Sequence, residues 1–246
     1  MRVIMENIST DKLKELNSLF TRMGKQFTET IAASIHEINF GGCDTSNVED
    51  MSSAFKYCRK LKELDLSTFD TRSVKYMQNM FSDCLCIEKL NISSFDTSNV
   101  ETMHGMFFGC TKIKELDLSN FDTRLVKYTS CMFSRCSSLE KLNISSFDTS
   151  NVVNMHGMFY GCTKIKELDL SNFDTRSVEY TSYIFSDCSS LEKLNVSSFD
   201  ISNVVTMTDM FKGCSKLRKI KLPIESKSRE LFIRQLNRDS INCEID

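Results

Sequence analysis

The cysteines are the side chains in this sequence with the clearest capacity for chemistry. The sequence holds eleven of them. Seven recur at intervals of 26 residues: Cys58, Cys84, Cys110, Cys136, Cys162, Cys188 and Cys214. Thiols can form disulfides, bind zinc or stay free. Because seven is odd and no C-x-x-C pair occurs, we favour buried free thiols over a disulfide ladder and expect no structural zinc.

Four further cysteines do not follow this spacing: Cys43, Cys86, Cys131 and Cys243. Cys131 occupies a position that is Gly105 or Gly157 in neighbouring copies. A thiol at that position is expected to be exposed, where it could take part in association between chains.

Aspartate recurs with the same spacing as cysteine. Its seven positions are Asp44, Asp70, Asp96, Asp122, Asp148, Asp174 and Asp200. Carboxylates stacked in a column could hold calcium between them, but the glycine-rich nonapeptide of calcium-binding β-rolls is missing. We therefore predict that each carboxylate accepts backbone N–H groups of the turn that follows it, and we expect no cofactor and no metal.

Histidine offers little for catalysis. The sequence has three, of which His104 and His156 occupy the same position two copies apart and His36 precedes the first expected strand. Catalysis usually requires different groups that converge on one point, and no G-x-S-x-G, Walker or H-E-x-x-H pattern occurs. We therefore expect no enzyme.

Arginine and tyrosine recur together in every second copy. The six residues are Arg72, Tyr76, Arg124, Tyr128, Arg176 and Tyr180. Arginine and tyrosine are enriched at the centres of protein interfaces, so these six are the candidate partner-binding residues. The alternative is that each arginine stacks on the tyrosine four residues later and has no external role.

A repeat of 26 residues must position all these side chains. The dipeptide Phe-Asp begins at Phe69, Phe95, Phe121, Phe147, Phe173 and Phe199, and Cys43-Asp44 provides an earlier copy. Pairs of aliphatic residues follow the same spacing from Ile38/Phe40 to Ile220/Leu222, which gives eight such segments. A fixed period of this length over seven copies is the sequence signature of a solenoid.

Within one copy, the pattern changes from that of a strand to that of a helix. Leu90 and Ile92 flank the polar Asn91, which is the alternation of a short strand. The segment Ser98-x-x-Glu101 has the form of a capping box. Apolar residues then follow at helical spacing until Gly109, which we expect to end a two-turn helix in a left-handed conformation.

Neighbouring copies differ in a regular way, so that the full period is 52 residues. The charged pair before each strand reverses from Lys62-Glu63 to Glu88-Lys89, and the reversal continues to Glu192-Lys193. The outward strand residue alternates between Asp and Asn over the same copies. In a parallel stack this reversal places Lys beside Glu, so we predict that it fixes the register.

These patterns predict an α/β fold. We expect a right-handed solenoid like that of leucine-rich repeats, with eight short parallel strands, one short helix per 26-residue coil and helical caps at both ends. The expected parts of this one continuous domain are a cap at 1–34, seven repeats at 35–224 and a cap at 225–246. Helices are expected at 9–27 and 228–238, and the one proline, Pro223, should block any further strand.

Charge and composition exclude several partners. The sequence has 31 Lys plus Arg against 33 Asp plus Glu, a net charge of −2, whereas nucleic-acid binders usually carry a basic excess. No segment approaches the ~20 apolar residues that a membrane helix needs. No signal peptide precedes Asn7, so a cytoplasmic location is expected if Met1 is the true start.

The block LEKLNISSFDTSNVVNMHGMFYGCTKIKELDLSNFDT resembles the BspA-like leucine-rich repeat surface-protein family. Repeats of that family carry a similar strand, Trp/Phe-Asp-x-Ser-Asn-Val, M-x-x-M-F and a return segment, and the resemblance covers roughly residues 35–224. Unlike the usual leucine-rich repeat, this one has Phe69 and its equivalents where an Asn or Cys ladder is expected. The resemblance implies a rod-like protein that is secreted or displayed at a cell surface for adhesion or host interaction.

The function that we expect is a repeat scaffold that binds another macromolecule, most simply a protein, as a monomer. The alternative is a structural spacer or a rod that assembles with itself through Cys86, Cys131 or an open coil edge. A lectin would require an aromatic column beside the Asp and Asn residues of the strands, and the sequence has none there.

Overall fold

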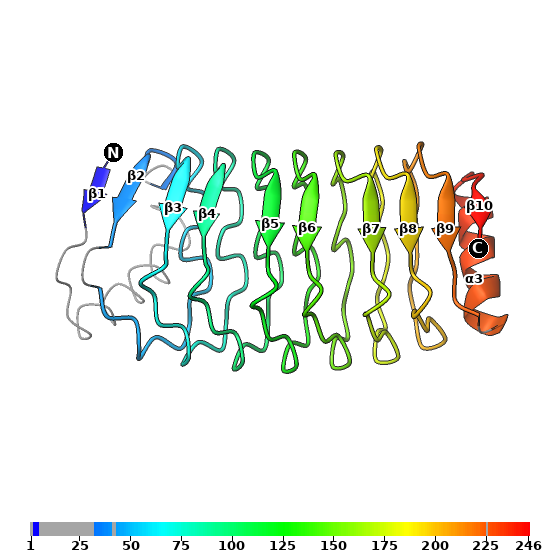
Figure 1. The fold of residues 1–246 in the computed structure, drawn as a ribbon, viewed down its shortest axis with the longest axis horizontal. Helices are drawn as coiled ribbons and strands as arrows, with labels where there is room; N and C mark the ends of the chain where they lie inside the picture. Colours follow the sequence, from blue (N-terminus) through cyan, green and yellow to red (C-terminus); the bar gives the residue numbers. More distant parts are fainter. Residues whose placement is uncertain (1, 5–31, 41–42, 225) are drawn as a thin grey trace.

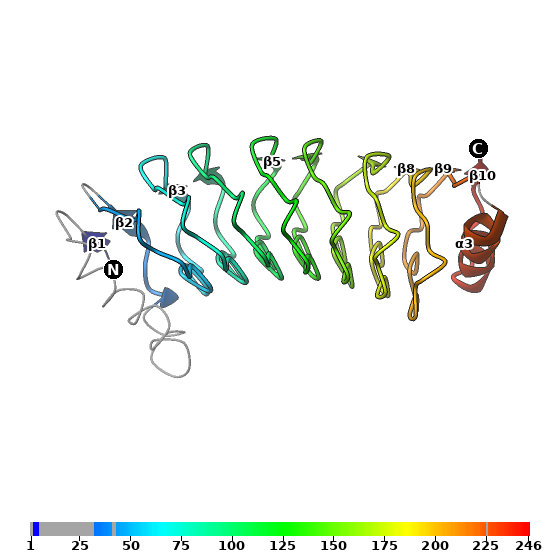
Figure 2. The same ribbon diagram turned by 90° about the horizontal axis from the view of Figure 1, so that it is seen from below.

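In a computed structural model, the chain forms a parallel solenoid whose coils lie side by side along one long axis (Figures 1 and 2). The structure describes residues 2–4, 32–40, 43–224 and 226–246. Each coil is one 26-residue repeat, because that period brings equivalent residues of neighbouring copies into register.

Each coil contributes one three-residue strand, at the eight positions that the aliphatic pairs predict. These strands are β2 (Glu37–Asn39), β3 (Glu63–Asp65), β4 (Lys89–Asn91), β5 (Glu115–Asp117), β6 (Lys141–Asn143), β7 (Glu167–Asp169), β8 (Lys193–Asn195) and β9 (Lys219–Lys221). Two strands were not predicted: β1 (Arg2–Ile4) pairs with β2, and β10 (Glu244–Ile245) pairs with β9, both in parallel.

The prediction of one helix per coil is wrong. Within residues 77–84, every second amide donates to a carbonyl of the next coil, as Phe81 does to Met106 at 2.8 Å. The amides between them donate three residues back, as Ser82 does to Asn79 at 3.0 Å. An α-helix needs its amides for bonds four residues back within the segment. Successive turns take its place and leave half of the amides to join the coils.

Left-handed residues at two positions per coil explain why the helix does not form. Gly109 has φ +70°, as predicted, and Gly105 four residues earlier has φ +58°. In the preceding coil, Asn79 and Asp83 occupy these positions with φ of 56° and 59°. Asn and Asp tolerate this conformation better than most residues, but two such residues per coil interrupt any helix. The apolar spacing is compatible with both structures, so it could not distinguish them.

The core consists of columns of identical side chains. Six successive phenylalanine pairs from Phe55 to Phe211 stack with centroids 5.5–5.9 Å apart. Beside them, the seven repeated cysteines are buried and free, so the thiol prediction is confirmed and a disulfide ladder is wrong. The thiols from Cys84 to Cys214 donate to the preceding coil, as Cys136 does to the Phe107 carbonyl at 3.1 Å. Burial raises the pKa of Cys136 to about 12, which makes this thiol unreactive.

The aspartate column behaves as predicted. In each of the seven, Oδ1 accepts the backbone N–H of the residue two positions later, at 2.9–3.1 Å. The predicted capping box is wrong, because the Ser98 hydroxyl donates to Asp96 Oδ1 at 2.6 Å and there is no helix to cap.

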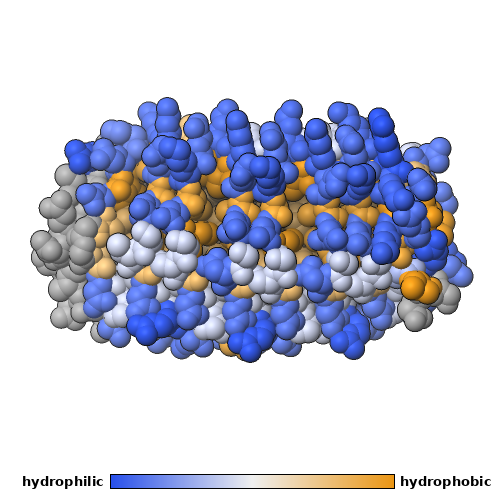
Figure 3. Space-filling model, in the orientation of Figure 1, coloured by the Kyte–Doolittle hydropathy of each residue, from blue (hydrophilic) through white to orange (hydrophobic). Residues whose placement is uncertain are grey.

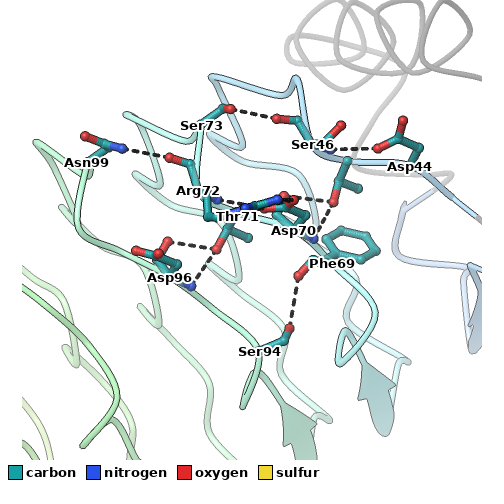
Figure 4. A network of polar contacts seen from close by, with 11 residues as sticks. Asp44, Ser46, Phe69, Asp70, Thr71, Arg72, Ser73, Ser94, Asp96 and Asn99 are labelled. Atoms are coloured by element: carbon teal, nitrogen blue, oxygen red, sulfur yellow. Dashed lines mark hydrogen bonds and ion pairs between the residues drawn. The ribbon is translucent and has the colours of Figure 1, made fainter.

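A column of buried threonines, which the sequence analysis missed, joins successive coils (Figure 4). The hydroxyl of Thr123 donates to the Asp148 carbonyl of the next coil at 2.8 Å, and the Asp148 N–H donates back to it at 2.8 Å. The same hydroxyl-to-carbonyl bond recurs from Thr45 to Thr175. The column ends at Ile201, whose N–H is bound by the Ser228 hydroxyl.

Between β3 and β8, the 52-residue period corresponds to two kinds of junction between coils. In the described part of the chain, strands pair at β3–β4, β5–β6 and β7–β8–β9, whereas β4 and β5, like β6 and β7, belong to separate sheets. Lys and Glu form ion pairs of 2.6–2.7 Å at β3–β4, β5–β6 and β7–β8. The charge reversal therefore brings opposite signs together at alternate junctions, not along the whole column as predicted.

Side-chain length follows the same alternation. At the paired junction, the short Ser94 side chain donates to the Phe69 carbonyl at 3.1 Å. At the next, unpaired junction, the longer Asn120 amide takes this role and donates to the Phe95 carbonyl at 3.0 Å. On this face, hydrophilic side chains border an apolar strip that runs along the long axis of the molecule, across the strands (Figure 3).

The C-terminal end is closed by helix α3 (Ser226–Arg238) and by β10. The Phe232 ring of α3 lies 6.3 Å from Phe199 and 6.2 Å from Phe211, so it continues the aromatic columns. The expectation that Pro223 blocks a further strand is wrong, because β10 pairs with β9 beyond it. The helix expected at 9–27 lies outside the described residues.

Replacing Thr123 with Val is expected to lower the free energy of unfolding by about 1–3 kcal/mol, because the N–H and C=O of Asp148 lose the buried Thr123 hydroxyl as their partner. Thr123→Ser keeps the hydroxyl and is the matched control. Urea unfolding followed by circular dichroism measures both variants. A Val variant as stable as the Ser variant would show that the threonine column does not hold the coils together.

Candidate functional site

Half a repeat away from the strands, the chain forms a second ladder that runs without interruption. Isolated parallel bridges connect Asp50, Tyr76, Thr102, Tyr128, Asn154, Tyr180 and Thr206 in succession. Amides on either side of each bridge bind the adjacent coils, as Met103 does to the Tyr128 carbonyl at 3.0 Å. We call Tyr76, Tyr128 and Tyr180 the tyrosine row. Every second coil contributes one member.

The tyrosine row is exposed, although its backbone is fixed. The three side chains are 38%, 48% and 38% exposed, in chain order, and they are the aromatic members of the exposed large hydrophobic residues in the described chain. Val126 and Thr129, which flank Tyr128, are buried. The ring therefore projects from a segment that is anchored on both sides.

A groove of about 490 Å³ lies between the first two tyrosines. Its lining residues are Tyr76, Gln78, Glu101, Thr102, His104, Lys127, Tyr128 and Ser130. Nδ1 of His104 lies 2.7 Å from the Ser130 hydroxyl oxygen, so this pair is fixed by a hydrogen bond. The groove thus has a tyrosine at either end and residues with polar side chains between them.

The three predicted arginines do not stack on the tyrosines. Nε and Nη2 of Arg124 bind the two carboxylate oxygens of Asp122 at 3.0 and 2.6 Å, and Arg72 and Arg176 bind Asp70 and Asp174 in the same way. The aromatic rings that cations approach in the described chain belong to other residues. Each guanidinium is therefore held by its own aspartate and not by the tyrosine four residues later.

The arginine pairs change the acidity of their aspartates. The hydrogen bond from Arg124 is the main reason that the pKa of Asp122 lies below its usual value, and the same holds for Asp70 and Asp174 with their arginines. The side chains of the three arginines stay 71–75% exposed. Each arginine therefore presents an exposed but fixed guanidinium whose charge is balanced by its aspartate, four residues before a tyrosine of the row.

The sequence analysis missed several residues of this surface. His104 and His156 were noted as equivalent. That they lie on the coils between successive tyrosines of the row could not be predicted without knowing the path of the backbone within each coil. His156 packs its ring 5.6 Å from Tyr183. Leu125 is 49% exposed. Its exposure could have been predicted from the sequence, because Leu replaces the polar Asn or Ser found at this position in other copies.

The described residues contain neither a metal-binding cluster nor a membrane-spanning helix. They contain no group of three or more His, Cys, Asp or Glu side chains placed to bind a metal ion. No helix in this part of the chain has the length and apolar character needed to cross a bilayer.

Comparison with known proteins gives one family and two partial structural likenesses. The model of a family described as Mycoplasma protein of unknown function, DUF285, matches residues 15–141 and 102–222. A leucine-rich repeat protein from Bacteroides ovatus ATCC 8483 is 20% identical, with a TM-score of 0.37 over 78% of this chain and 61% of that one. A chain of a TLR13–ssRNA13 complex is 13% identical, with a TM-score of 0.22 over 87% of this chain and 50% of that one.

The chain thus spans less than two thirds of either structural relative. No curated protein matches it. The family match does not name the BspA-like repeats that the sequence resembles.

The aspartate–arginine pairs predict a specific response to acid. A carboxylate whose pKa is lower in the folded than in the unfolded chain stabilises the fold at pH values above its unfolded pKa of about 4, and this contribution is lost as the pH falls through the folded pKa. We expect the melting temperature to stay level from pH 7 to pH 5 and to fall below about pH 4.

The triple variant Asp70→Asn, Asp122→Asn, Asp174→Asn tests the cause. Asn keeps an oxygen for the backbone N–H but cannot lose a proton, so the drop in melting temperature between pH 5 and pH 3 should be smaller than in the original chain. Scanning calorimetry across this range measures the drop. An equal drop in both proteins would assign acid sensitivity to other groups.

Proposed function

This chain belongs to the DUF285 family, and we propose that it is a non-enzymatic scaffold that binds another protein through its tyrosine row. The observation that carries this proposal is the exposure of three tyrosines, 38–48%, on a backbone ladder that neighbouring coils hold on both sides. Tyrosine supplies a large contact area with few rotatable bonds, so little conformational entropy is lost when a partner binds.

The tyrosines are not required for the ladder itself. The same bridge forms at Asp50, Thr102, Asn154 and Thr206, where the side chains are small and polar. A solenoid that acted only as a spacer could use such residues in every coil. Three exposed aromatic rings at one position, two coils apart, are suited to contact with a partner.

The fixed arginines add specificity to this surface. Each guanidinium is bound by an aspartate two residues before it, so its position is set before a partner arrives. Display at a cell surface is part of the proposal and rests on the resemblance of the repeats alone.

We expect the triple variant Tyr76→Ala, Tyr128→Ala, Tyr180→Ala to weaken capture of a protein partner at least tenfold, since truncated interface tyrosines each cost about 1–2 kcal/mol. Its melting temperature should stay close to that of the original chain. The measurement is retention of partners from cell extract on the immobilised full chain, with quantitative mass spectrometry.

The matched control is Tyr160→Ala, which removes a half-buried tyrosine from another column. Partners retained equally by the triple variant and by the original chain would exclude the tyrosine row as the binding surface.

A further inference from the structure

We propose that the tyrosine row binds a segment in the polyproline II conformation, with one turn of the ligand for each interval between tyrosines. This inference rests on the proposed function, because it names the class of partner that the same surface would take. Three features carry it: the spacing of the tyrosines, the polar groups between them and the charge of the surface.

The spacing follows from the ladder. Thr102 forms a bridge to Tyr76 on one side and to Tyr128 on the other, and Asn154 does the same between Tyr128 and Tyr180. Neighbouring strands lie ~4.8 Å apart, so backbone positions two coils apart are separated by about 9.6 Å. A polyproline II helix has three residues per turn and rises ~3.1 Å per residue, a repeat of about 9.3 Å. The two periods differ by about 0.3 Å per interval.

Other peptide conformations fit this spacing less well. An extended strand places a side chain on the same face every two residues, about 6.6 Å apart. This distance does not divide evenly into the roughly 9.6 Å between tyrosines, so the strand would not present a side chain to each ring. An α-helix brings the same face back after two turns, about 10.8 Å, which accumulates a mismatch of about 2.4 Å over the row. Helices are also bound in grooves lined by apolar side chains, whereas the residues between Tyr76 and Tyr128 are polar or charged.

The polar residues between the tyrosines suit a ligand whose backbone offers only acceptors. A polyproline II segment makes no internal hydrogen bonds, and its prolines have no N–H. The interval between Tyr76 and Tyr128 contains Thr102 and His104, and the next interval has Asn154 and His156 at the equivalent positions. Each turn of the ligand would therefore meet the same kinds of group, a small polar side chain and an imidazole.

The charges beside the row favour an uncharged ligand. Lys75 is neutralised by Glu49, with Nζ 3.0 Å from the carboxylate. Glu101 and Lys127, which both line the groove, have opposite signs and lie on adjacent coils. The first interval thus carries no net charge, so it would select neither an acidic nor a basic peptide. A proline-rich segment supplies flat rings to stack on tyrosine and loses little conformational entropy.

The test is binding of fluorescein-labelled decaproline to the full chain by fluorescence anisotropy. We expect decaproline to bind and a glycine–serine decapeptide not to bind. Tyr128→Ala should weaken binding at least tenfold, because it removes the central ring. Tyr160→Ala should leave it unchanged. The melting temperature of each variant shows that it is folded.

A double variant that exchanges two residues separates the effect of tyrosine spacing from the effect of the number of tyrosines. Thr102→Tyr combined with Tyr128→Thr keeps three tyrosines on the ladder but changes their intervals to one coil and three coils. We expect it to bind decaproline as weakly as Tyr128→Ala. Binding equal to that of the original chain would overturn the match of periods.

The remaining outcomes distinguish failure of this inference from failure of the proposed function. If a β-1,4-linked glucose hexasaccharide binds in a tyrosine-dependent way and decaproline does not, the row is a glycan site and this inference is wrong. If decaproline does not bind but protein capture still depends on the three tyrosines, the scaffold stands and the polyproline class is excluded. If neither depends on them, both proposals fall.

Discussion

Registration between neighbouring coils is the interaction on which the rest of this structure depends. Half of the amides in each run of turns bind the next coil instead of closing a helix, and a buried threonine hydroxyl bonds to both polar backbone groups of the aspartate one repeat later. Both sets of hydrogen bonds hold equivalent residues of successive coils above one another. Stacked phenylalanines, buried thiols and the tyrosine row are consequences of that alignment, since each column requires its members to repeat at one position of the coil.

The two ladders differ in how regularly they join the coils. The bridges that contain the tyrosine row continue over every described coil from Asp50 to Thr206, whereas the strands on the other side are grouped into separate sheets. Ser94 and Asn120 show how the sequence accommodates this, because a longer side chain spans the junction where strands do not pair. A surface used to recognise a repeated ligand needs constant spacing, and it is the uninterrupted ladder that provides it.

Much of this architecture could be predicted from the sequence, because a period without insertions leaves one way to stack the copies. The eight strands, the free thiols and the aspartate turns follow from that period and from local chemistry. The helix was mispredicted because apolar residues three apart also suit successive turns, and nothing local marks Asn79 as left-handed. The role of Thr123 was missed because its partner lies one repeat away. Stacking of Arg124 on Tyr128 was considered as an alternative because of the helical spacing, but Asp122 binds the arginine instead.

Amide hydrogen exchange of the full chain, with and without decaproline, tests the central claim that aligned coils present the tyrosine row at a constant interval. The account predicts slower exchange on ligand binding in three segments, centred on Tyr76, Tyr128 and Tyr180, with little change in strands β3–β9. Protection that appears instead along the strands, or in one segment alone, would contradict it.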